Sequence, residues 1–320
     1  MQQINPRTLP ADAIRPNGAG HKLRRRIVRN WELYLFIAPA FFYFLIFHYG
    51  PMYGIQIAFK NYIPTRGFFG SEWVGFEHFT RFFQSYYFWD LIWNTLSISL
   101  YDLAVGFPLP ILLALAFNEA KNGFFKRAVQ TITYAPHFIS VVVMAGMIIT
   151  FLSPSTGIMT HILQWFGLEA PNVLTDPKWF KTMYVLSNVW QGAGWGTIIY
   201  LAALSAVDPQ LHEAAIMDGA SRVRRIWHIN LPAIVPTIII LLILNMGSVL
   251  SVGFEKILLL QNSLNMESSD VISTFVYRSG LLDAQYSFST AVGLFNSVVN
   301  AALLIAVNRI ARRTSETSLW

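Results

Sequence analysis

The chain has 320 residues, of which 54% are hydrophobic and only 12% are charged. Soluble domains carry about 25% charged residues, so the composition excludes an ordinary water-soluble globule. Cysteine is absent, which excludes disulfides, thiolate metal sites and cysteine nucleophiles. The formal net charge of +6 invites a nucleic-acid interpretation, but the uneven distribution of Lys and Arg explains it better as membrane topology.

Six apolar stretches follow a basic segment at residues 1–30, which we expect to be a cytoplasmic tail ending in a short amphipathic segment. Each stretch has the roughly 20 residues that a membrane-crossing helix needs, and backbone hydrogen bonds must close within such a span. The chain is therefore predicted to be an all-α membrane protein with six core transmembrane helices. The predicted spans are 33–59, 91–117, 128–152, 183–207, 233–254 and 288–310, within a transmembrane domain at 31–313 that precedes a C-terminal tail at 314–320.

Lys and Arg are distributed unevenly between the two sides of this predicted bundle. The termini, the second–third loop and the fourth–fifth loop hold 16 of the 23, and the remaining 7, Lys256 among them, fall in the other loops. Loops rich in Lys and Arg stay in the cytoplasm. We therefore expect a multi-pass protein with both termini and the fourth–fifth loop on the cytoplasmic side.

Polar side chains within the predicted spans are costly and so are candidates for function. Asp102 lies clearly mid-span; it belongs either to a pore or ion site or to a pair with a neighbouring helix, and no Lys or Arg lies at a matching depth. Amides can line an aqueous path or hold helices together, and aromatic rings beside them suit the faces of sugars or an ordinary interface. The residues considered for a substrate path are Asn94, Asn188, Trp190, Gln191, Trp195, Asn245 and Asn296.

Motifs for catalysis fail on inspection. His212 and Glu213 begin like the helix of a zinc hydrolase, but the second His that this site needs is replaced by Ile216. Gly192 and Gly196 fit close helix packing better than a dinucleotide loop. No phosphate-binding loop and no nucleophile elbow are present in the sequence. We therefore expect a chain without catalytic residues that does not hydrolyse ATP by itself.

The fourth–fifth loop is a polar interruption in an apolar chain. Asp208 is expected to cap a short helix at 209–218, and Gly219 allows a sharp reversal. A second short helix at 221–228 carries Arg222 and two further arginines. This pattern predicts a helix–turn–helix knob that docks in a groove of another protein, or alternatively an amphipathic loop on the membrane surface.

At this loop the sequence resembles a known family. Glu213-Ala214-Ala215, Gly219, Ile229 and Leu231-Pro232 have the spacing of the EAA loop of bacterial ABC importer permeases. Other stretches resemble the branch of that family that serves oligo- and polysaccharides, and the resemblance covers roughly residues 30–313. Those stretches include Gly50-Pro51-Met52-Tyr53-Gly54, Trp73-Val74-Gly75-Phe76 and Phe254-Glu255-Lys256-Ile257.

The resemblance implies a permease subunit of an ATP-driven importer in the bacterial inner membrane. Its partners would be a second homologous permease subunit, two cytoplasmic ATPase subunits and a periplasmic or extracellular solute-binding protein, with membrane lipid around the helices and no nucleic acid. No cofactor would bind to this chain, since ATP and Mg would reside on the ATPase subunits. In that family the EAA loop contacts the ATPase, and the coupling residues here would be Glu213, Ala214, Ala215, Asp218, Gly219 and Arg222.

The expected cargo is an oligo- or polysaccharide, with an alginate-like acidic glycan as the leading candidate from the resemblance. The predicted outer loops do not favour an acidic polymer, because they hold 7 basic and 9 acidic residues. The alternative function is an ion-coupled secondary transporter of a polar solute. That class uses carboxylates within the membrane and related halves, whereas Asp102 stands alone and no internal repeat is visible.

Overall fold

A computed structural model describes residues 28–121, 123–314 and 317–319. Most of the two predicted tails, 1–30 and 314–320, lies outside the described residues. The chain divides into two compact units, residues 1–56 and 57–320. Each unit is described separately below.

The first unit is a nearly continuous apolar helix. It consists of α2 (Trp31–Phe44), the π-helical η1 (Leu45–Tyr49) and α3 (Gly50–Met52), and η2 (Tyr53–Phe59) continues it as a 3-10 helix into the second unit. Pro51 lacks the N–H that an α-helix would use. The wider π turn precedes it, with the Gly50 N–H bonded to the carbonyl of Leu45. The helix therefore continues through Gly50-Pro51.

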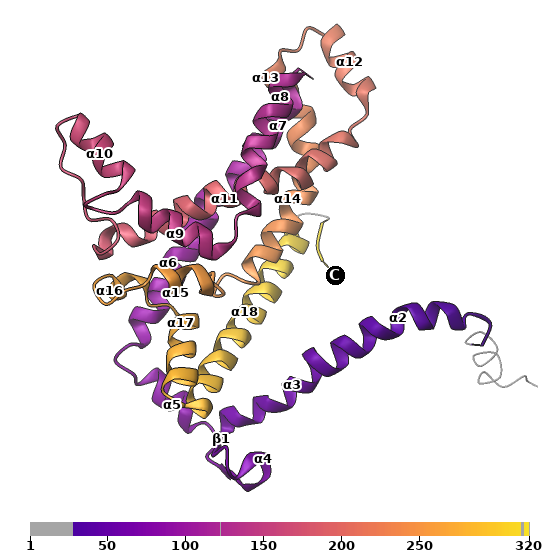
Figure 1. Ribbon diagram of the computed structural model, residues 1–320. Helices are drawn as coiled ribbons and strands as arrows, with labels where there is room; N and C mark the ends of the chain where they lie inside the picture. The colour runs from indigo at the N-terminus through magenta and orange to yellow at the C-terminus, as the bar shows by residue number, and fades with distance from the viewer. Residues whose placement is uncertain (1–27, 122, 315–316, 320) are drawn as a thin grey trace, which may run out of the picture. The chain divides into compact units, whose positions relative to one another are not determined.

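The second unit is mostly helical. Its described strands are β1 (Lys60–Asn61) and β2 (Glu72–Trp73), which pair antiparallel with Lys60 opposite Trp73. The helices are drawn in Figure 1. They are α4 (Gly67–Gly70), α5 (Glu77–Phe83), α6 (Phe88–Gly106), α7 (Pro108–Glu119), α8 (Phe124–Tyr134), η3 (Ala135–Phe138), α9 (Val141–Phe151), α10 (Ile158–Trp165), α11 (Pro177–Ser205), α12 (Pro209–Met217), α13 (Arg222–Arg225), η4 (Ile226–Asn230), α14 (Leu231–Met246), α15 (Phe254–Leu260), α16 (Met266–Ser269), α17 (Ile272–Tyr277), η5 (Arg278–Leu282) and α18 (Tyr286–Thr314).

Four helices in the described part of the chain are long and apolar enough to cross a membrane: Trp31–Phe59, Phe88–Glu119, Arg222–Met246 and Tyr286–Arg313. A fifth span results if Phe124–Phe138 and Val141–Phe151 are counted together, although they meet at a bend of 102°. The stretch predicted as the fourth span forms α11, which has 29 residues but is not among these apolar helices. The count of six spans therefore stays a prediction, whereas the predicted helical fold class is confirmed by a structure that is mostly helix.

Helix α11 is the central element of the second unit, because it packs against α6, α7, α8 and α14. One apolar cluster, which includes Tyr184, joins α11 to α6, α9 and α15. Another, which includes Tyr200, joins it to α7 and α14. A third cluster, around Phe82, joins α5, α6, α17 and α18. These three clusters therefore pack the helices of the second unit against one another and hold the side chains between them in place.

The close contact between α11 and α8 depends on one glycine. A Cβ at Gly194 would lie 2.1 Å from the carbonyl oxygen of Thr133, far inside van der Waals contact. A Cβ at Gly196 would meet Pro110 at 3.1 Å, whereas Gly192 has open space around it. Within this chain, Gly192 therefore does not have the packing role that was predicted for it. The closest approach is made by Gly194, which the spacing of Gly192 and Gly196 did not single out.

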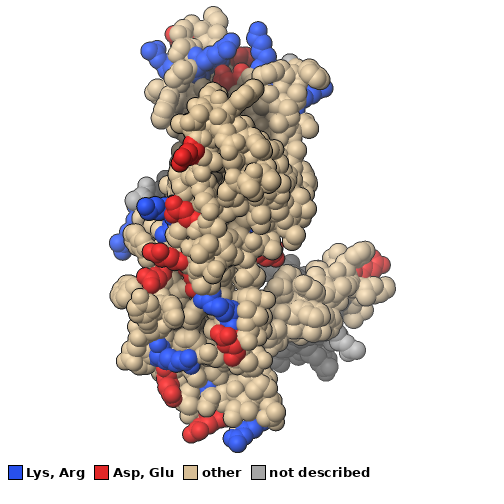
Figure 2. Space-filling model, turned by 60° about the vertical axis from the view of Figure 1, so that its left-hand side comes forward, with Lys and Arg blue, Asp and Glu red and all other residues tan. Residues whose placement is uncertain are grey.

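The two ends of the second unit differ. Helices α12 and α13 lie with the start of α8 at one end, and α4 and α5 lie at the other (Figure 1). Figure 2 shows Lys and Arg gathered at the α12 end, above a broad surface with few charges. The segments at this end carry Lys121, Lys126, Arg127, Arg222, Arg224 and Arg225. The second–third and fourth–fifth loops therefore lie together, as their shared positive charge predicts.

Candidate functional site

The helix predicted to cross at 233–254 ends early, and its end opens a cavity. Helix α14 stops at Met246, and residues 247–253 are irregular. Asn300 of α18 holds this segment: its Oδ1 accepts the Leu250 N–H at 3.0 Å, and its Nδ2 donates to Ser251 Oγ at 3.0 Å. Irregular backbone at membrane depth is tolerated where it is buried or lines a polar cavity. Gly247, Ser248, Ser251 and Gly253, which are poor helix formers, were the sequence signal for this break.

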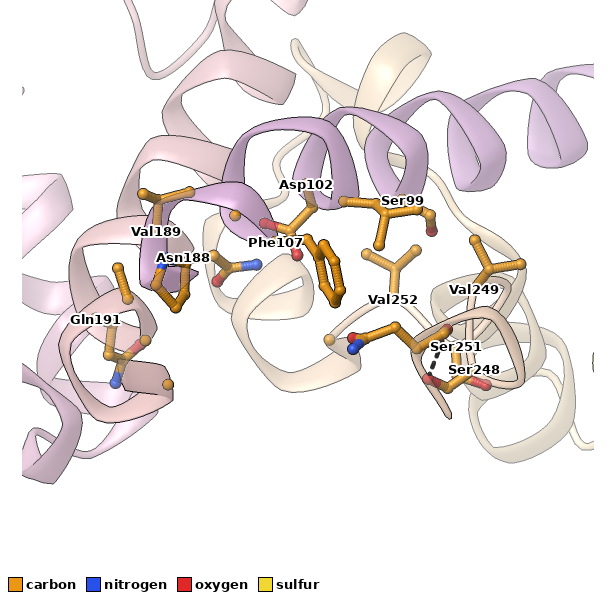
Figure 3. A pocket seen from close by; sticks show the side chains of 18 of the residues that line it. Ser99, Asp102, Phe107, Asn188, Val189, Gln191, Ser248, Val249, Ser251 and Val252 are labelled. Carbon is orange, nitrogen blue, oxygen red and sulfur yellow. Dashed lines mark hydrogen bonds between the residues drawn. The ribbon is translucent and has the colours of Figure 1, made fainter. Parts of the chain in front are cut away.

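The cavity beside this segment, called here the α11 cavity, has a volume of about 820 Å³. It is lined by α6, α7, α11, α14, the irregular segment and the start of α15. Figure 3 shows Asp102 and Asn188 facing each other, with Ser248 and Ser251 across the cavity. Its polar lining residues are Ser99, Asp102, Asn188, Gln191, Asn245, Ser248, Ser251, Glu255 and Lys256. Hydroxyls, amides and charges on an otherwise apolar wall are the groups that bind a polar solute.

Lys256 is the residue that the sequence analysis misplaced. We predicted it in an outer loop and found no cation at the depth of Asp102, but α15 folds back so that Lys256 is only 5% exposed and lines the α11 cavity. Its Nζ donates to Asn188 Oδ1 at 2.6 Å and to Gln191 Oε1 at 2.8 Å. Asp102 forms a hydrogen bond with Asn188 and interacts electrostatically with Lys256. Asp102 therefore lines the cavity and also faces groups of neighbouring elements, which fits both interpretations of this residue.

Three of the seven residues considered for a substrate path meet in the α11 cavity. They are Asn188, Gln191 and Asn245. Gln191 also donates to the carbonyl of Ile139 at 2.9 Å, and Asn245 donates to the carbonyl of Leu241 in its own helix at 2.7 Å. Each of these amides therefore both faces the cavity and is held in place by the protein.

The other four lie elsewhere. Trp190 is half exposed, and Trp195 stacks on His137 with ring centroids 4.4 Å apart. The Oδ1 of Asn296 is buried and has no hydrogen-bond partner in the described part of the protein. Asn94 lines a second cavity, next to α17, and donates from Nδ2 to the carbonyls of Glu267 and Asp270 at 2.8 and 3.2 Å.

This second cavity, the α17 cavity, has a volume of about 1240 Å³ and lies among α5, α6, α16, α17 and α18. An ion pair borders it, in which Arg278 Nη2 lies 2.5 Å from Asp270 Oδ2. The same carboxylate accepts from Thr274 at 3.0 Å. Because Asn94 and Arg278 both bond to Asp270, this cavity wall is tied together by polar contacts.

The helix–turn–helix knob forms as its capping residues predict. Asp208 accepts the Gln210 N–H at 2.9 Å and begins α12, with Pro209 at the first helical position. Ser221 accepts the Arg224 N–H at 3.4 Å and begins α13. A side-chain acceptor at this position satisfies an N–H that the helix cannot, so both helices of the knob start where the sequence indicates.

Gly219 makes the reversal between the two helices. Its φ is +74°, in the left-handed region that residues with a Cβ rarely adopt. The Gly219 N–H bonds to the carbonyl of Ile216 at 3.0 Å, and the Ala220 N–H bonds to that of Ala215 at 2.8 Å. This pair of bonds closes the end of α12 in a Schellman motif. The turn therefore depends on the conformation of Gly219 and not on space around it, since a Cβ there would touch nothing.

The second helix of the knob was predicted to end at residue 228, but in the structure it extends further. It continues through the π-helical η4 into α14, and Arg222–Met246 forms one continuous helix. Pro232 has no N–H to give to the preceding turn, and the π turn lies immediately before it, with the Leu231 N–H bonded to the carbonyl of Ile226. The fifth predicted span and the knob are therefore parts of the same rod.

The knob surface combines charge with exposed apolar side chains. Glu213, Ala214, Asp218, Gly219 and Arg222 are exposed, and Ala215 is half-buried. Beside them Ile216 is 55% and Met217 87% exposed. The six residues considered for coupling therefore lie on a surface of the knob that is largely accessible and partly apolar.

Glu119, at the end of α7, ties this knob to the helix bundle. Its Oε1 accepts from Nδ2 of the fully buried Asn230 at 3.1 Å, and its Oε2 lies 4.0 Å from Arg225 Nη2. The Arg225 Nε and the Asn230 Oδ1 are buried without a partner among the described residues. The sequence analysis missed Glu119, because its contacts are with residues more than one hundred positions away.

Replacing Glu119 by alanine is expected to lower the stability of the knob, because Asn230 would lose its buried acceptor. Such a loss costs about 1–3 kcal/mol, and thermal unfolding of the purified assembly measures it. Glu119→Gln keeps an oxygen for Asn230 and is expected to lose less. Glu169, whose exposed side chain lies outside the knob, provides the control. Glu169→Ala should leave the melting temperature unchanged; an equal loss in all three variants would contradict the assignment.

Comparison with known proteins places the chain in a family. The family described as "Binding-protein-dependent transport system inner membrane component" matches residues 106–316. A polygalacturonan/rhamnogalacturonan transport system permease protein of Bacillus subtilis is 46% identical over 93% of this chain and 93% of its own length. Protein LplB of the same organism is 45% identical over 95% of each chain.

Solved structures agree with this result. A crystal structure of a bacterial ABC transporter involved in the import of the acidic polysaccharide alginate has a chain that is 47% identical, with a TM-score of 0.85 over 92% of this chain and 99% of that one. A second structure, an alginate ABC transporter in complex with a pentasaccharide-bound periplasmic protein, gives 47% identity and a TM-score of 0.86, covering 93% of this chain and 100% of that one.

These relatives confirm the resemblance to ABC importer permeases and decide against the ion-coupled secondary transporter. One relative is named a transport system permease protein, and the family is described as an inner membrane component of a transport system. This confirms the expectation of a non-catalytic membrane subunit. The conclusion is that this chain belongs to the family of inner membrane components of binding-protein-dependent transport systems.

Proposed function

We propose that this chain is one permease subunit of an importer for acidic oligo- or polysaccharides and that the α11 cavity is its part of the sugar path. The observation that carries the proposal is the polar wall that Asn188, Gln191 and Asn245 form in a cavity of about 820 Å³. Two relatives at 46% and 47% identity are named for polygalacturonan and for alginate. Both polymers carry carboxylates on their sugar rings, which supports an acidic cargo.

The energy for import would come from ATPase subunits that contact the knob. Glu213, Ala214, Ala215, Asp218, Gly219 and Arg222 form this contact in the proposal. The exposure of Ile216 and Met217 supports it, because such side chains favour burial in a groove. ATP and Mg would be bound by the partner subunits, and this chain would contribute no catalytic residue.

The proposed assembly contains this chain, a second homologous permease subunit, two cytoplasmic ATPase subunits and an external solute-binding protein. Both termini would face the cytoplasm, as the distribution of Lys and Arg indicates. The second permease would complete the wall of the α11 cavity. ATP binding would then shift the population between states open to opposite sides of the membrane.

Uptake by the complete importer tests this proposal. With all partners in proteoliposomes, a labelled uronate oligosaccharide is expected to enter only with ATP inside and with the binding protein outside. Asn245→Leu should reduce uptake by about 2- to 12-fold, since one lost hydrogen bond is worth about 0.5–1.5 kcal/mol and 1.4 kcal/mol is a factor of ten. Leu244→Val, next to it and off the cavity lining, should have little effect. Uptake driven by an ion gradient without ATP would contradict the proposal.

A further inference from the structure

Lys256 occupies an unusual position for a lysine in the α11 cavity. Its side chain is only 5% exposed, so it has lost most of the water that normally surrounds an ammonium group. Its acceptors, Asn188 Oδ1 at 2.6 Å and Gln191 Oε1 at 2.8 Å, are neutral amides. An ammonium has three N–H donors, so these amides orient the group without cancelling its charge.

The compensating charge comes from Asp102 on α6, through an intermediary. Asn188 receives a hydrogen bond from Lys256 and forms one with Asp102, so it lies between the two charges. Within the described chain, direct ion pairs closer than 4.0 Å are Arg225–Glu119 and Arg278–Asp270, and Asp102–Lys256 is not one of them. The amide of Asn188 therefore lies between the two charges, which form no direct ion pair in the described chain.

The other charged residues of the cavity determine where an anionic ligand can bind. In the described lining Lys256 is the only Lys or Arg, whereas Asp102 and the exposed Glu255 are both acidic. General attraction of a polyanion to this wall is therefore excluded. A carboxylate can be favoured at one point only, the ammonium of Lys256.

We propose that Lys256 is the carboxylate-recognising residue of the sugar path, and that a uronate carboxylate of the glycan takes over the ammonium that Asp102 otherwise compensates. This inference rests on the proposed passage of sugar through the α11 cavity. The exchange replaces one counter-charge by another, so binding stays moderate and the sugar can leave again, as a transport path requires. A neutral sugar offers hydroxyls but no charge, and Lys256 then remains with Asp102.

A merely structural role makes a different prediction. If Lys256 only ties α15 to α11 through Asn188 and Gln191, its loss should affect acidic and neutral sugars alike. The matched probes are a uronate oligosaccharide and the same molecule with its carboxyl groups reduced to alcohols. Their ring structure and length are equal, so the ratio of their affinities isolates the contribution of the carboxylate.

The experiment measures binding of both probes to the complete, purified importer without the binding protein, so that the external protein does not select between them. Wild type is expected to bind the uronate probe about tenfold more tightly than the reduced one, which corresponds to about 1.4 kcal/mol. Lys256→Met should abolish this preference, and Lys256→Arg should retain most of it. Asp102→Asn, which removes the competing carboxylate, should increase it.

The outcomes separate the two levels of the proposal. Two results for Lys256→Met would overturn the role of Lys256 and leave the proposed function intact. One is an equal loss of affinity for both probes. The other is an unchanged preference for the uronate probe, in a variant that elutes from size-exclusion chromatography and hydrolyses ATP like the wild type. Failure of the wild-type importer to take up either probe with ATP overturns the proposed function itself. If Lys256→Met does not assemble, Asp102→Asn decides, because an unchanged or weaker preference for the uronate contradicts the exchange.

Discussion

Replacing Gly194 by alanine is expected to destabilise the second unit more than the same substitution at any other glycine of α11. The new Cβ would lie 2.1 Å from the carbonyl oxygen of Thr133, which belongs to the backbone of α8 and cannot rotate away. The two helices must then separate, and overpacking of this kind costs about 1–3 kcal/mol, occasionally more. The melting temperature and the yield of assembled importer measure the loss.

Gly192 provides the matched control two residues earlier in the same helix. A Cβ there would meet no atom within 4 Å, so Gly192→Ala should leave the melting temperature unchanged and slightly improve the helix propensity of α11. Equal stability of Gly194→Ala and Gly192→Ala would show that α8 and α11 are not in contact at Thr133.

Replacing Gly219 by valine is expected to uncouple ATP hydrolysis from sugar uptake. The position needs a φ of +74°, and a β-branched residue is a genuine outlier there. The cost of about 1–2 kcal/mol for a left-handed residue corresponds to roughly a 5- to 30-fold loss of the correctly formed turn. Stimulation of ATP hydrolysis by the loaded binding protein, measured in the complete importer, should fall by a similar factor.

Gly219→Asn tests whether this effect comes from the backbone conformation. Asparagine tolerates the left-handed region better than other residues with a side chain, and a side chain at this position meets open space. We therefore expect Gly219→Asn to keep most of the stimulation. Full coupling in Gly219→Val would mean that the reversal after α12 is not part of the contact with the ATPase.

Local features of the sequence predict much of this structure. The acceptors at Asp208 and Ser221 and the glycine at position 219 place the knob within one residue at three of its boundaries, because caps and turns depend on neighbouring residues. The long apolar stretches likewise predict helices, since hydropathy is a property of a continuous segment. The π turn before Pro232 was missed, and with it the continuity of α13 with α14.

The arrangement of the candidate site could be predicted only in part. Asn188 and Gln191 are three residues apart and share a helix face, which makes them a reasonable pair from the sequence alone. Lys256 joins them across 68 positions, after a break in the preceding helix that hydropathy treats as membrane-spanning. For that reason the count of Lys and Arg placed Lys256 in an outer loop. Lys256 was therefore not recognised as the partner of Asp102.

Because Arg222–Met246 is one continuous helix, a movement of the knob can be transmitted to the other end of this helix. At 1.5 Å per residue these 25 residues form a rod of roughly 37 Å. A tilt of about 10° imposed at the arginine end would displace the other end by about 6 Å, the length of a single turn of helix. That far end is Met246, where the irregular segment lining the α11 cavity begins. In the proposed importer, a small rotation of the knob would therefore displace the cavity end of this helix by about 6 Å.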